Sequence, residues 1–173
     1  AVKYCNAVCK KKHRSKHKKA CERRVAELHD EKLFADPPPP EECPICFLPL
    51  QCGNQTETFK SCCGKTVCVG CIFAMKMREG KDLCAFCRTP RATSEEEIKL
   101  LEKLMEKRNG GAYNVLAGYY AHGRLGLPRD YQKASGLYHR AGELGCAEGY
   151  YNLGICYGHG RGVEVDITKA KHY

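Results

Sequence analysis

Residues 43–87 read CPICFLPLQCGNQTETFKSCCGKTVCVGCIFAMKMREGKDLCAFC, and the spacing of their cysteines decides how this part of the chain folds. Eight of the nine cysteines form four pairs: Cys43 and Cys46, Cys62 and Cys63, Cys68 and Cys71, Cys84 and Cys87. Two thiolates separated by two residues make half of a tetrahedral zinc site. Three pairs with this spacing and the adjacent pair Cys62 and Cys63 predict a small module that is held together by two Zn2+ ions.

The whole chain has 173 residues and 14 cysteines. The two-residue spacings favour metal ligands over disulfides, and the sequence shows no signal peptide. We therefore expect an intracellular protein, cytoplasmic or nuclear. No apolar run approaches the roughly 18 residues of a membrane helix, so no membrane partner is expected. Because the sequence opens on Ala1 and stops at Tyr173 inside a repeat, we expect a fragment of a longer protein.

The chain divides into five segments by composition. A Pro-rich linker separates a basic start from the cysteine-rich stretch, and a helix joins that stretch to a repeat array. The segments are 1–35 (basic), 36–42 (linker), 43–93 (cysteine-rich), 94–111 (linking helix) and 112–173 (repeats).

The linking helix has clear start and stop signals. Ser94 followed by Glu97 predicts a capping box, and Asn109-Gly110-Gly111 predicts the end. One apolar face is predicted from the spacing of four residues: Ile98, Leu101, Leu104 and Met105. A helix with this pattern packs on a neighbour rather than carrying chemistry.

The repeat emerges when residues 112–145 are compared with 147–173. Each unit predicts a helix, a glycine-rich turn and a second helix, and Leu125 is an extra residue in the first turn. The matched residues are Leu116, Tyr120, His122, Gly123 and Arg124 with Leu153, Tyr157, His159, Gly160 and Arg161. This pattern resembles the Sel-1-like repeat, a relative of the tetratricopeptide repeat. The resemblance implies an α-helical solenoid that binds proteins on a concave surface, although two units would also serve as a spacer or cap.

The order and spacing of the cysteine pairs resemble a RING finger. The resemblance implies a cross-brace, in which the first and third pairs bind one zinc and the second and fourth pairs bind the other. Lys65 stands where most RING fingers have a histidine ligand, and Cys62 would supply the missing thiolate. Cys52 is the one spare cysteine of the stretch, and it is the alternative to Cys62 as a ligand.

The same resemblance implies a ubiquitin ligase that docks a ubiquitin-conjugating enzyme and performs no covalent chemistry itself. Three apolar residues match the docking positions of the family: Ile45, Met75 and Pro90. Arg88 matches the arginine that bridges the conjugating enzyme and ubiquitin, a role that suits its planar set of donors. The alternative role is ordinary packing for Ile45 and Met75, a chain turn for Pro90 and a solvated surface charge for Arg88. The rival function is a non-catalytic zinc-binding adaptor or scaffold.

The first 35 residues carry a net charge of +7 of the chain's +9, from 11 Lys/Arg and 4 Asp/Glu. Their spaced cysteines and histidine resemble the second half of a MYND finger, which implies binding of proline-containing peptides by this protein-interaction module. The implied zinc ligands are Cys5, Cys9, His17 and Cys21. These four either complete sites with residues upstream or close one Cys3His site alone. The basic run 10–19 has no interleaved aromatic residue for base stacking, which argues against a nucleic-acid partner.

The sequence thus predicts small zinc-stabilised modules, MYND-like and RING-like, followed by a Sel-1-like or tetratricopeptide-like solenoid. The favoured function is a RING-type ubiquitin-protein transferase with flanking modules for protein partners. Hydrolase and oxidoreductase functions are not supported, because the sequence has no nucleotide-binding glycine loop and its cysteines leave no open metal position.

Overall fold

The computed structural model describes residues 23–28, 41–50, 57–80 and 82–173. The chain forms two compact units, Ala1–Pro40 and Glu41–Tyr173. In the first unit, residues 23–28 are helical. The predicted N-terminal ligands and the spare cysteine lie outside the described residues: Cys5, Cys9, His17, Cys21 and Cys52.

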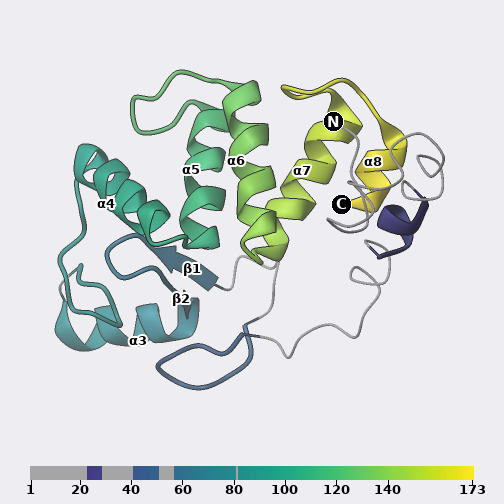
Figure 1. Cartoon of the computed structure of the whole chain (residues 1–173). Coiled ribbons are helices and arrows are strands. Elements are labelled where there is room, and N and C mark those ends of the chain that lie inside the picture. The colour runs from purple at the N-terminus through teal and green to yellow at the C-terminus, as the bar shows by residue number, and fades with distance from the viewer. Residues whose placement is uncertain (1–22, 29–40, 51–56, 81) are drawn as a thin grey trace. The chain divides into compact units, whose positions relative to one another are not determined.

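The second unit begins with a cysteine-rich part and continues as a series of helices (Figure 1). The cysteine-rich part contains β1 (Glu57–Lys60), β2 (Lys65–Cys68) and α3 (Val69–Glu79). The helical part contains α4 (Ser94–Glu106), α5 (Gly110–His122), α6 (Tyr131–Glu143), α7 (Ala147–His159) and α8 (Ile167–His172). None of the helices among the described residues is long and apolar enough to cross a membrane.

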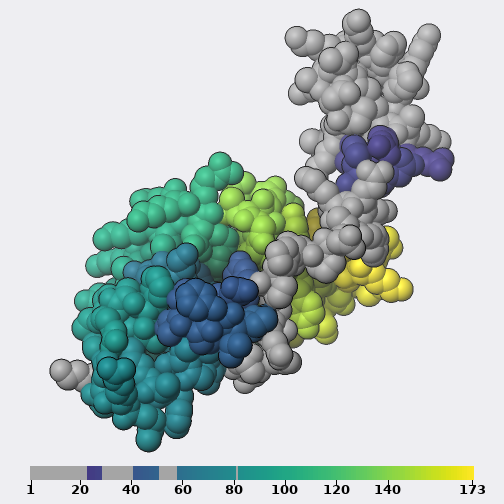
Figure 2. All heavy atoms as spheres, turned by 90° about the horizontal axis from the view of Figure 1, so that it is seen from below, coloured from purple at the N-terminus to yellow at the C-terminus, as the bar shows by residue number. Residues whose placement is uncertain are grey.

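Strands β1 and β2 form an antiparallel hairpin in which Glu57 lies opposite Cys68 and Lys60 opposite Lys65. The segment 41–50, blue in Figure 2, lies beside the teal residues of the same unit. Its Cys43 and Leu50 are buried together with Val67 of β2 in a small apolar cluster. Because this cluster has only three buried residues, it removes little apolar area from water. Hydrophobic burial alone therefore contributes little to the stability of the cysteine-rich part.

The N-cap of helix α4 lies one residue before the predicted one. Thr93, not Ser94, is the N-cap: its hydroxyl accepts a hydrogen bond from the Glu96 backbone N–H, and the Glu96 carboxylate accepts from the Thr93 N–H. Both Thr93-x-x-Glu96 and Ser94-x-x-Glu97 fit a capping box, so the sequence alone favoured the wrong one. The predicted apolar face is confirmed, with Leu101 fully buried and Leu104 and Met105 packed beside it.

The predicted end of that helix is also wrong. Helix α4 ends at Glu106, and Asn109 is the N-cap of α5 rather than a stop signal. The Asn109 side chain accepts from the Ala112 backbone N–H at 3.0 Å. Asparagine is common at the start of a helix and also just after its end. The two glycines after Asn109 therefore suggested the end of α4, although Asn109 begins α5.

The repeat pairs α5 with α6 and α7 with α8, and the matched residues occupy equivalent places. Gly123 and Gly160 end the first helix of each unit in the left-handed conformation, with φ of 63° and 67°. Asp130 and Asp166 cap the second helix of each unit. The extra residue Leu125 also takes a left-handed φ of 55°, which absorbs the insertion within the turn.

Small residues bring α6 and α7 into close contact. A Cβ on Gly142 would lie 2.3 Å from the ring of Tyr150, and one on Gly149 would lie 2.6 Å from the Cβ of Ala141. The buried core of the repeats consists of Ala117, Ala134, Tyr138, Leu153 and Cys156.

Candidate metal centres

The eight paired cysteines gather into two separate groups. In each group the four sulfur atoms lie within 4.8 Å of one another. The first group contains Cys43, Cys46, Cys68 and Cys71, and the second contains Cys62, Cys63, Cys84 and Cys87. The first and third pairs therefore meet, as do the second and fourth, which is the interleaved arrangement that the spacing resemblance implied.

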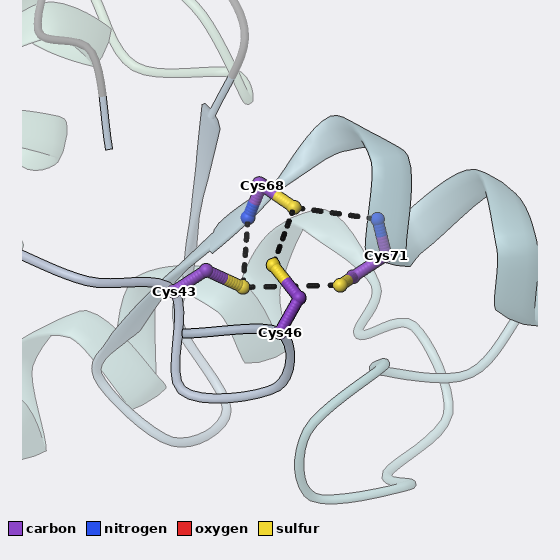
Figure 3. A group of neighbouring side chains, drawn as sticks. All are labelled: Cys43, Cys46, Cys68 and Cys71. Atoms are coloured by element: carbon purple, nitrogen blue, oxygen red, sulfur yellow. Dashed lines mark hydrogen bonds between the residues drawn. The ribbon is translucent and has the colours of Figure 1, made fainter. Parts of the chain in front are cut away.

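The first group has the geometry of a tetrahedral thiolate site (Figure 3). The Sγ atoms of Cys43 and Cys71 are 3.9 Å apart, and those of Cys46 and Cys68 are 3.7 Å apart. Four sulfurs that each lie about 2.3 Å from a central zinc would be roughly 3.8 Å apart. These two distances match that value and the remaining sulfur pairs lie within 4.8 Å, so the four residues fit a zinc ion.

Backbone N–H groups support the first group. The Cys68 N–H donates to the Cys43 sulfur at 3.5 Å, and the Cys71 N–H donates to the Cys68 sulfur at 3.4 Å. Both donors come from the junction between β2 and α3, where Cys68 is the helix N-cap. The hairpin and the first turn of α3 therefore hold two of the four ligands in a fixed orientation.

The second group is more open. The Sγ atoms of Cys63 and Cys84 are 4.0 Å apart and those of Cys62 and Cys87 are 3.4 Å apart. Cys87 is exposed, and its sulfur also contacts the Thr89 hydroxyl at 3.1 Å. Lys65 is exposed on β2 and is not part of the group. The adjacent Cys62 takes the fourth position instead.

Two thiols are poised to ionise in the absence of metal. Burial by itself raises the pKa of Cys43. Hydrogen bonds from the backbone of Cys68, Cys46 and Ile45 outweigh that effect and lower the pKa to about 6. Burial likewise opposes ionisation of Cys87, and hydrogen bonds from Thr89 lower its pKa to about 6. Burial raises the pKa of Cys62 and Cys71. Hydrogen bonding thus favours the thiolate form of one cysteine in each group, and a thiolate is the form that binds a metal cation.

The two outer cysteine pairs are built as near copies of one another. The backbone N–H of Phe47 donates to the Cys43 carbonyl and that of Arg88 to the Cys84 carbonyl, both at 2.9 Å. Phe47 and Arg88 share a left-handed φ, 57° and 62°. A single β-bridge closes each loop, Glu42 with Pro49 and Leu83 with Pro90. The sequence analysis missed this likeness, although a proline three residues after each pair was a signal for it.

The four predicted docking residues differ in exposure. Ile45 is 37 % exposed, and Arg88 and Pro90 are exposed as well. Met75 is only 9 % exposed, because it lies on the inner side of α3. Arg88 forms an ion pair with Glu79, the last residue of α3, which the sequence analysis did not single out.

The helical part matches a known family. A model described as the Sel1 repeat matches residues 111–146 and 147–173, which confirms the predicted repeat. Among solved structures, a Sel1 repeat protein from Oxalobacter formigenes aligns with a TM-score of 0.44 and 31 % identity, over 49 % of this chain and 34 % of that one. The cysteine rich protein B of Helicobacter pylori aligns with a TM-score of 0.46 and 22 % identity, over 60 % and 77 %.

Two kinds of curated plant protein are similar over part of the chain. E3 ubiquitin-protein ligase DA2 of Arabidopsis thaliana is 36 % identical over 76 residues, 39 % of this chain and 18 % of that protein. E3 ubiquitin-protein ligase GW2 of Oryza sativa is 33 % identical over 76 residues, 39 % and 17 %. The chain thus spans less than a fifth of the length of these relatives. What the comparisons establish for the chain itself is that residues 111–146 and 147–173 are Sel1 repeats.

Proposed function

We propose that residues 43–93 form a zinc-binding RING-type finger that acts as a ubiquitin ligase. The observation that carries the proposal is the interleaving of two tetrahedral cysteine groups along one short stretch of chain. The partial similarity to plant E3 ubiquitin-protein ligases supports it. The proposed resident metal is Zn2+, which thiolate groups of this geometry favour.

In this proposal the ligase works by positioning. Zinc would fix the two outer cysteine loops, whose exposed Ile45 and Pro90 would contact a ubiquitin-conjugating enzyme. Arg88 would donate hydrogen bonds to the enzyme and to its bound ubiquitin. Holding the thioester in a reactive pose lowers the entropic part of the barrier without any covalent step on the ligase. Because Met75 is nearly buried, the docking surface rests mainly on the other three residues.

The flanking modules are proposed to recruit other proteins. The Sel1 repeats would bind a protein to be modified, and the basic first segment would form a MYND-like finger with Cys5, Cys9, His17 and Cys21 as its ligands. Both assignments rest on residue patterns. In this proposal, the flanking modules bind the proteins that the ligase would modify.

Ubiquitin discharge tests the proposal. Purified residues 1–173 would be mixed with a panel of ubiquitin-loaded conjugating enzymes, and loss of the thioester would be followed. We expect faster discharge that is abolished in Ile45→Ala and in Arg88→Ala while the zinc content stays at the wild-type level. Both side chains lie outside the cysteine groups, so neither change removes a ligand. Tyr151→Ala, at an exposed site in the repeats, is the matched control.

A zinc-loaded chain that accelerates no member of the panel would refute the ligase function. That result would leave a zinc-binding adaptor as the function of this chain.

A further inference from the structure

The cysteine-rich part and the repeats share an apolar cluster. Phe59 of β1 packs against the buried cluster that Leu101 of α4 forms with Ala112 and Leu116 of α5. These three residues are buried, with Leu101 and Ala112 fully inaccessible to solvent. The hairpin therefore contributes an aromatic ring to the hydrophobic core of the first repeat.

Two glycines make this approach possible. A Cβ on Gly111, in the first turn of α5, would lie 2.6 Å from the Phe59 ring. A Cβ on Gly64, in the turn of the hairpin, would lie 3.0 Å from both the Leu104 side chain and the Asn109 amide. The turn and the helix are thus in contact at distances that only glycine permits.

Asn109 links the two parts by hydrogen bonds. Its side-chain oxygen accepts from the Ala112 N–H and starts α5, while its side-chain nitrogen donates to the Gly64 carbonyl at 3.3 Å. Gly64 follows directly after Cys63, a ligand of the second cysteine group. One amide therefore connects the first turn of the repeats to the segment that carries a metal ligand.

We infer that Phe59, Asn109 and Gly111 form a junction that couples metal binding in the cysteine-rich part to the folding of the first Sel1 repeat. With metal bound, the turn around Gly64 holds its shape and α5 is anchored on it. Without metal, the turn loses its fixed form, and α4 and α5 lose the Phe59 ring and the Asn109 contact together.

The junction also gives the repeats one direction relative to the cysteine-rich part. If that part is a ligase, which rests on the function proposed above, a protein bound to the repeats would be presented to the conjugating enzyme from a fixed side. Asn109 would then be a positioning residue, because it touches neither substrate nor metal.

Hydrogen exchange measured by mass spectrometry tests the coupling. Residues 1–173 would be compared with zinc bound and after removal of zinc with EDTA. We expect metal removal to speed exchange in the hairpin and also, about tenfold or more, in amides 112–117 of α5.

Asn109→Asp separates the two roles of the side chain. A carboxylate still accepts from the Ala112 N–H and caps α5, but it has no N–H to donate to Gly64. In this variant, and in Gly111→Ala, we expect zinc removal to speed exchange in the hairpin alone. Asp130→Asn makes the reverse swap at the cap of α6, away from the junction, and should respond as the wild type does.

The inference would be overturned if α5 in the wild type exchanged at the same rate with and without zinc. It would also fail if both junction variants kept the wild-type response of α5. The exchange measurement contains no conjugating enzyme, so a failed ligase assay and a failed coupling test give separate answers.

Discussion

A carboxylate of its own module holds the guanidinium of Arg88. Because Glu79 ends α3 and Arg88 follows Cys87, the ion pair joins the helix to the second outer cysteine loop. The side chains are 55 % and 27 % exposed, so solvent screens the pair and its worth is about 0.2–1 kcal/mol. Such an interaction contributes little to stability but restricts where the arginine points.

Glu79→Gln is therefore expected to slow ubiquitin discharge by roughly 1.4- to 5-fold, the rate equivalent of that energy. Glu95→Gln, at an exposed site on α4, is the matched control and should leave the rate unchanged. Single-turnover discharge by the wild type and the two variants is the measurement. An equal slowing in both variants would show that Glu79 does not act through its contact with Arg88.

Variants can show whether Cys62 or Cys52 is the fourth ligand of the second cysteine group. The structure brings Cys62 to the group, 3.4 Å from Cys87 by their sulfur atoms. We expect Cys62→Ser to lower the zinc content by one ion per chain, and Cys52→Ser to leave it unchanged. Elemental analysis of the purified variants gives the count. The reverse result would make Cys52 the ligand.

Among the helices, the contact between α6 and α7 depends on a missing side chain. Gly142→Ala places a methyl group against the Tyr150 ring and is expected to destabilise the chain by about 1–3 kcal/mol. Gly136 lies on the same helix, and a Cβ added there would meet no atom within 4 Å, so Gly136→Ala should stabilise by roughly 0.5–1 kcal/mol. Urea unfolding of both variants measures the difference. Equal effects would mean that α6 and α7 are not so closely packed.

Helix α4 is tied to α5 by a tyrosine. The Tyr119 hydroxyl donates to the Glu97 carboxylate at 2.6 Å, and burial together with that carboxylate raises the pKa of Tyr119. At pH 8 we expect Tyr119→Phe to cost about 0.5–1.5 kcal/mol. A raised folded-state pKa means that the benefit is complete below about pH 10, the ordinary tyrosine value, and is lost as the pH rises further. The gap between the two proteins should narrow above pH 10 in urea unfolding.

At the scale of the whole molecule, the sequence predicted best what local chemistry fixes. The resemblance of the cysteine spacing to a RING finger implied which pairs would meet, and the structure brings those pairs together in two groups. Repeat length allowed the helices of the solenoid to be placed, because each unit is the same local motif. Start signals were less certain: Thr93 and Ser94 are equally good caps, and only the fold selects one.

The sequence did not predict the contacts between segments that lie far apart in the chain. Nothing in the spacing of Phe59 or Asn109 shows that the hairpin packs on α5, because that contact depends on the path of the chain. The inward position of Met75 has the same origin: helical periodicity names a face, but the neighbours decide which face is covered. These contacts between distant segments are therefore known from the structure and not from the sequence.

Interleaving of the two cysteine groups imposes an order on biosynthesis. As the chain leaves the ribosome, the first group is complete once Cys71 has emerged, and the second must wait 16 residues longer for Cys87. In that interval six of the eight grouped cysteines have emerged. A zinc ion in the first group, as proposed above, would therefore be bound before the second group is complete.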